Sequence, residues 1–68
     1  MRDWQKVYQD SNEQRAEIVK AILEDMEMKP VLLNKKDSAY QFGAFEVLVR
    51  PDFVLRALKV INDDIKFE

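Results

Sequence analysis

Apolar and polar residues alternate in some stretches of this chain and recur with helical spacing in others, and the two periods predict its elements. Residues 4–8 alternate, with Trp4, Lys6 and Tyr8 on one face and Gln5, Val7 and Gln9 on the other. Because apolar and polar side chains occur on both faces, we expect a first strand that is only partly buried.

A helix is predicted to follow, because its start, its face and its end all carry sequence signals. Ser11 and Gln14 have the spacing of a capping box. In this motif the Ser11 hydroxyl accepts a hydrogen bond from the backbone N–H of Gln14, and the Gln14 side chain accepts one from the backbone N–H of Ser11. Proline disfavours helical angles in the residue before it, so Pro30 is expected to end the helix. Between these signals, apolar residues recur at helical spacing: Ala16, Val19, Ile22, Leu23 and Met26.

Two further runs read as strands. Residues 31–33 are a short continuous apolar run, which suits a buried strand. In residues 45–49, Phe45, Val47 and Val49 alternate with other side chains in a β-rich composition. We expect the two strands to be neighbours joined by a long loop, with Gly43 where the loop turns back.

A second helix is predicted after Pro51, whose missing N–H is tolerated in a first helical turn. Its apolar stripe is expected to face the core and consists of Val54, Leu58, Ile61 and Ile65. Residues 62–64 are polar and predict its end, so residues 65–67 are left as a short closing strand or as coil.

The order of these elements predicts an α+β fold over one domain, residues 1–68. A β-α-β-β-α order suits a ferredoxin-like two-layer sandwich, an antiparallel sheet with both helices on one face. No remaining segment is available to cover the other face of the sheet. That face must be polar, bind a partner or pair with a second copy, and we expect a homodimer that buries it with Trp4 and Tyr8 near the contact.

The amino-acid composition excludes several kinds of functional site. The chain of 68 residues has no Cys and no His, which excludes a zinc site of the usual ligands, a thiol nucleophile and an imidazole base. Its net charge of −2 lacks the basic surplus of a nucleic-acid binder. It has no apolar run that could span a bilayer and no signal-peptide pattern at residues 1–6. We expect a cytoplasmic protein without metal or cofactor, and with no catalytic residues.

Several stretches resemble a known family: residues 6–8, 17–23, 31–40 and 43–49, of which residues 34–40, Asn-Lys-Lys-Asp-Ser-Ala-Tyr, are the most specific. The chain resembles a small bacterial family described as putative prokaryotic signal-transducing proteins and likened to PII-type regulators. The resemblance implies a ferredoxin-like fold and a bacterial cytoplasmic setting. It implies no nucleotide site, because the chain has no glycine pattern that cradles phosphate.

The loop after residue 33 is the candidate site. A binding loop would offer ammonium, hydroxyl and aromatic groups, whereas a simple turn would use Asp37 and Ser38 to hydrogen-bond the local backbone. The candidate residues are Asn34, Lys35, Lys36, Asp37, Ser38, Tyr40 and Gly43. We expect a non-catalytic regulatory module that acts through this loop or the uncovered sheet face, toward a protein partner. The alternative is a sensor of a small anionic metabolite, with an enzyme as a distant third.

Overall fold

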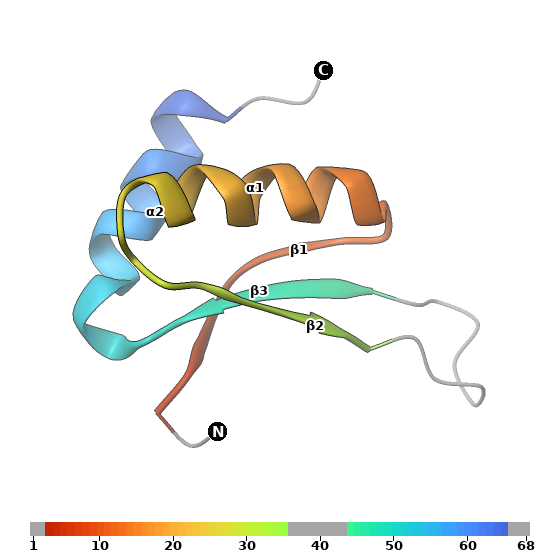
Figure 1. Cartoon of the computed structure of the whole chain (residues 1–68), viewed down its shortest axis with the longest axis horizontal. Coiled ribbons are helices and arrows are strands. Elements are labelled where there is room, and N and C mark those ends of the chain that lie inside the picture. Colours follow the sequence, from red (N-terminus) through yellow and green to blue (C-terminus); the bar gives the residue numbers. More distant parts are fainter. Residues whose placement is uncertain (1–2, 36–43, 66–68) are drawn as a thin grey trace.

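The computed structural model describes residues 3–35 and 44–65, and within these ranges the predicted α+β class is confirmed. These residues form a sheet, two helices and a short 3-10 helix, and Figure 1 shows how the helices lie over the sheet. In chain order the elements are β1 (Gln5–Asp10), α1 (Glu13–Asp25), β2 (Val31–Asn34), β3 (Phe45–Val49), η1 (Pro51–Phe53) and α2 (Val54–Asp64).

Within the described residues the sheet has three strands in the order β1-β3-β2, and β3 runs antiparallel to both neighbours. The predicted pairing of the two central apolar runs is therefore confirmed. Since β1 and β2 both run against β3, they are parallel to each other, and α1 is the crossover that such a pair requires. Ile65 is extended but belongs to no strand, and residues 66–67 of the predicted closing strand lie outside the described residues.

A β-bulge in β1 changes which side chains share a face. Lys6 pairs with Leu48 and Tyr8 pairs with Val47, so Val7 is an extra residue between them. Val7 is buried in the core and Tyr8 packs against the same core. The predicted alternation is therefore wrong after Lys6, because the bulge turns two successive side chains toward the helices.

The helix α1 begins one residue later than the capping-box pattern predicts. Asn12, and not Ser11, is the N-cap, and its Oδ1 accepts hydrogen bonds from the backbone N–H of Gln14 at 2.8 Å and of Arg15 at 3.3 Å. The backbone N–H of Asn12 donates to Oδ1 of Asp10 at 2.8 Å. This third bond favours the extended conformation that Asn12 adopts as the N-cap.

The same helix ends at Asp25, well before Pro30, so the predicted proline stop is wrong. The N–H of Met28 donates to the carbonyl of Leu23 and the N–H of Glu27 to that of Glu24, which is the hydrogen-bond pattern of a Schellman motif. Glu27 takes the left-handed position with φ 61°, where glycine is the usual residue. Met28 and Leu23 are both fully buried and supply the hydrophobic contact of this motif.

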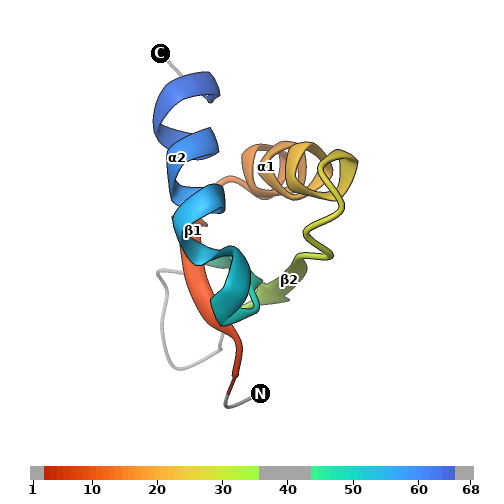
Figure 2. The same cartoon turned by 90° about the vertical axis from the view of Figure 1, so that its left-hand side faces the viewer.

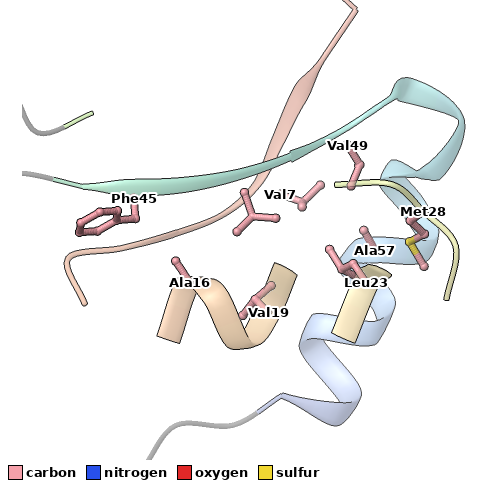
Figure 3. Close-up of a cluster of buried hydrophobic side chains, with 9 residues drawn as sticks. Val7, Ala16, Val19, Leu23, Met28, Phe45, Val49 and Ala57 are labelled. Carbon is pink, nitrogen blue, oxygen red and sulfur yellow. The ribbon is translucent and has the colours of Figure 1, made fainter. Parts of the chain in front are cut away.

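Both helices lie on the same side of the sheet (Figures 1 and 2), and the core fills the space between the layers. Figure 3 shows side chains from β1, β3, α1 and α2 meeting there, together with Met28. The fully buried members are Ala16, Val19, Leu23, Met28, Val47, Val49 and Ala57.

The two helices contribute unequally to this core. α1 contacts all three strands, whereas among the strands α2 packs mainly against β1. Of the predicted stripe on α2, Leu58 is 43% exposed, so the expectation that it is buried is wrong. Ala57 is the residue of α2 that is fully buried.

Candidate functional site

The base of the predicted binding loop is formed by Asn34 and Lys35, both exposed at the end of β2. The backbone N–H of Lys35 donates to the carbonyl of Ala44 at 2.8 Å, and this bond continues the pairing of β2 with β3 by one step. The other predicted site residues, Lys36, Asp37, Ser38, Tyr40 and Gly43, lie outside the described residues.

A polar cluster centred on Asp10 lies at the same end of the sheet, because Asp10 and Asn34 are the two cross-strand partners of Phe45. The Tyr8 hydroxyl donates to Oδ2 of Asp10 at 2.6 Å. The Arg15 guanidinium lies 3.9 Å from the same oxygen. The cluster thus ties β1 to the first turn of α1.

The protonation of this cluster follows from its hydrogen bonds. The bond from Tyr8 lowers the pKa of Asp10 below its usual range, and the backbone N–H of Asn12 and the charge of Arg15 act in the same direction. Burial, followed by the bond to Asp10, raises the pKa of Tyr8 to about 12. These shifts move both groups away from the near-neutral pKa that favours proton transfer. The arrangement suits a structural latch better than an acid–base pair.

The second candidate surface is the sheet face opposite the helices. The register places Lys6 and Val31 on either side of Leu48 in one cross-strand row. The next row contains Gln9, Glu46 and Leu33. We call this surface the open face, and its residues are Lys6, Gln9, Val31, Leu33, Glu46 and Leu48.

The open face is apolar on the β2 side and polar on the β1 side. Leu48 is only 8% exposed, although both helices of the described residues lie on the other side of the sheet. On the polar side, Nζ of Lys6 donates to Oε1 of Gln9 at 2.7 Å and lies 3.7 Å from Oε2 of Glu46. The open face therefore combines a nearly buried leucine with a charge-balanced polar edge.

Beyond Leu48 along the chain, Arg50 and Trp4 lie close together. The guanidinium carbon of Arg50 is 6.0 Å from the centroid of the Trp4 ring, a distance at which a cation–π contact contributes modestly. Trp4 is half-buried in this position. This contact gives Trp4 a partner within the chain.

An open depression of about 1010 Å³ lies where the α1–β2 connection meets η1, and no sequence pattern pointed to it. Its lining residues come from two stretches that are separated in sequence: Glu24, Glu27, Lys29, Pro30, Arg50, Asp52 and Phe53. Carboxylates outnumber cations in this set. Among the described residues, no group of three Asp or Glu side chains is placed to hold a metal ion.

Comparison with known proteins identifies the family. Residues 4–64 match the family model described as putative prokaryotic signal transducing protein. The chain belongs to this family. The matched range contains every described strand and helix, so membership covers the whole fold and does not single out one surface.

Two other comparisons found nothing: no curated protein and no solved structure matches the chain. Neither helix in residues 3–35 and 44–65 has the length and apolar character that crossing a membrane requires.

Proposed function

We propose that this member of the putative signal-transducing family is a non-catalytic regulatory module of the bacterial cytoplasm, and that it binds a protein partner through the open face. The proposal rests on one observation. Leu48, at 8% exposure, is flanked by half-buried Val31 and bordered by the polar edge of Lys6 and Glu46. An apolar centre with a polar border is the usual anatomy of a protein interface.

The shape of the open face also favours a protein over a small molecule. Small-molecule sites are concave, and the depression described above lies at the α1–β2 connection, lined by none of the open-face residues. A three-stranded sheet of short strands offers a limited contact area. We therefore expect a weak, transient complex of the kind found in signalling.

We also propose that the fold is ferredoxin-like. The split β-α-β unit, with β3 between β1 and β2 and both helices on one side, supports this assignment. Within the described residues the outer edge of β1, where this architecture places its last strand, has no strand beside it.

The second candidate function, a sensor of a small anionic metabolite, has less support. Exposed Lys35 at the loop base is a suitable cation. In the depression, however, Glu24, Glu27 and Asp52 outweigh Lys29 and Arg50, which opposes an anion there. A thermal-shift screen with anionic metabolites separates the two functions, since a ligand that binds only the folded state raises the melting temperature.

The test of the proposal uses two matched leucine substitutions. Leu33→Lys places a charge on the open face, and Leu55→Lys places the same charge on α2, where Leu55 is already 82% exposed. Each variant serves as bait in affinity capture from bacterial cytosol, beside the parent. We expect Leu33→Lys to lose the captured protein and Leu55→Lys to retain it. Retention by both variants would contradict binding through the open face.

A further inference from the structure

The order of side chains along β1, an edge strand, indicates a second interaction that the proposed function does not include. β1 and β2 are the two edge strands of the sheet, so in the described part of the chain β1 has a strand neighbour on one side only. An edge strand presents backbone donors and acceptors that another strand can pair with. β1 is the longer edge, with six residues against four in β2.

The bulge makes the face pattern of β1 symmetrical. Gln5 and Asp10 pair with core-facing Val49 and Phe45, so both lie on the helix side. Val7 and Tyr8 also lie on that side, whereas Lys6 and Gln9 lie on the open face. Read from either end, the six residues give the same order: helix side, open face, helix side, helix side, open face, helix side.

From this symmetry we infer that two copies of the chain associate edge to edge through β1, antiparallel about a two-fold axis between Val7 and Tyr8. In this register Gln5 stands opposite Asp10 of the second copy, and Lys6 opposite its Gln9. Every residue then meets one on its own side of the sheet. This is the only register that pairs all six residues of β1. Registers centred on Lys6 or on Gln9 also match sides, but each pairs only three residues, and the first sets two lysines opposite each other.

The charges on β1 fit the same arrangement. A symmetric interface must complement itself, and like charges directly opposite each other destabilise a strand pair. Here Lys6 faces Gln9 and Asp10 faces Gln5, so no like charges are opposed. Lys6 already donates to Gln9 within one chain at 2.7 Å, which shows that the two groups are compatible.

The joined sheet would have the order β2-β3-β1-β1-β3-β2, with both pairs of helices on one side. The two open faces would then be continuous on the other side, which doubles the surface of the proposed function. An edge contact between short strands buries little area, so we expect a weak dimer.

The test compares Gln9→Lys with Gln9→Glu, two changes at an exposed position. The first places a second ammonium group opposite Lys6 at both ends of the seam, and the second places a carboxylate there. Sedimentation equilibrium should show that the parent self-associates, that Gln9→Lys dissociates more readily and that Gln9→Glu associates more tightly. Two cross-strand charge pairs predict a change of roughly two- to thirtyfold in Kd for each variant. Circular dichroism on dilute samples checks that both variants are folded.

The control is Leu33→Lys on β2, which lies away from the seam and should leave Kd unchanged. This control also separates the dimer from the proposed function, because Leu33→Lys is expected to lose partner capture while still dimerising. A parent that stays monomeric to high-micromolar concentration would overturn the inference. So would a Kd that responds to Leu33→Lys and not to the two Gln9 variants.

Discussion

The two faces of the sheet differ in what covers them, and the central strand shows the difference most clearly. On the helix side of β3, Phe45, Val47 and Val49 are at most 6% exposed beneath α1 and α2. On the open face, Leu48 is nearly as buried, at 8%, without any covering helix in the described residues. A central strand thus shields its side chains on both faces, but only the helix side builds a core. On the open face the apolar surface that solvent can reach belongs to the half-buried Val31 and Leu33 of β2.

A second contrast lies within the covered side, between α1 and α2. α1 fully buries Ala16, Val19 and Leu23 because it crosses all three strands. α2 leaves Leu55 82% and Leu58 43% exposed. Helical periodicity therefore indicates which side of a helix faces the core, whereas the area of sheet beneath the helix decides how much of that side is buried.

The largest expected effect tests this contrast with two matched truncations. Leu23→Ala should lower the free energy of unfolding by about 2–5 kcal/mol, because it leaves a cavity in the closed part of the core. Leu58→Ala should lower it by less than about 1.5 kcal/mol, because the Leu58 side chain already contacts water. Urea unfolding of both variants measures the difference. Equal losses would show that α2 packs as closely as α1.

The next largest change in the free energy of unfolding is expected at the N-cap of α1. Asn12→Ala removes the oxygen that accepts from two backbone N–H groups and should lower the free energy of unfolding by about 0.5–2 kcal/mol. Ser11→Ala is the control, since Ser11 precedes the N-cap, and should change it by less than about 0.5 kcal/mol. Urea unfolding measures both. If Ser11→Ala lowers the free energy of unfolding more than Asn12→Ala does, Ser11 is the N-cap, as the capping-box pattern predicts.

A smaller effect, of opposite sign, is expected at the end of α1. Glu27→Gly should raise the free energy of unfolding by about 0.5–1 kcal/mol, because glycine adopts the left-handed φ of 61° without the strain of a Cβ atom. Glu17→Gly, in the exposed middle of the same helix, is the control and should lower it by about 1 kcal/mol. If both variants are destabilised alike in urea unfolding, the left-handed turn does not form.

The last expected effect is a loss of stability at high pH. Because the folded chain raises the pKa of Tyr8 from 10.0 to about 12, the fold favours the protonated phenol. The corresponding stability is fully present below pH 10 and is lost as the pH rises toward 12. Tyr8→Phe has no phenol to titrate, so its stability should fall less across this window. Thermal melts across the same pH range compare the two, and parallel curves would contradict the raised pKa of Tyr8, whose first cause is burial and second the bond to Asp10.

Much of the fold follows from local patterns. The β-rich alternation of residues 45–49 specifies a strand and its buried side, and this is confirmed. The apolar stripe of α1 is confirmed for Ala16, Val19 and Leu23, whereas its last predicted member, Met26, lies beyond the helix and is 38% exposed, so its expected burial is wrong. The cap was misplaced because Ser11 and Asn12 are adjacent and both side chains can cap. The early end of α1 depends on Met28 reaching the core, a tertiary contact that outweighs the proline signal.

The surfaces were harder to predict. A bulge is defined by the pairing of two strands, so the sequence of β1 alone does not predict the one at Val7. The simple alternation therefore places Tyr8 on the wrong face of the sheet. The depression joins the α1–β2 connection to η1, which only folding brings together. The open face itself was expected, because no segment remained to cover it.

The central claim, that the open face is the recognition surface, is tested most directly by NMR in bacterial cytosolic extract. Amide spectra of the ¹⁵N-labelled chain would be recorded with and without unlabelled extract. We predict chemical-shift changes concentrated at open-face residues such as Lys6, Leu33 and Glu46, while Leu55 and Leu58 on α2 stay unchanged. Changes confined to α2, with the open face unaffected, would contradict the claim.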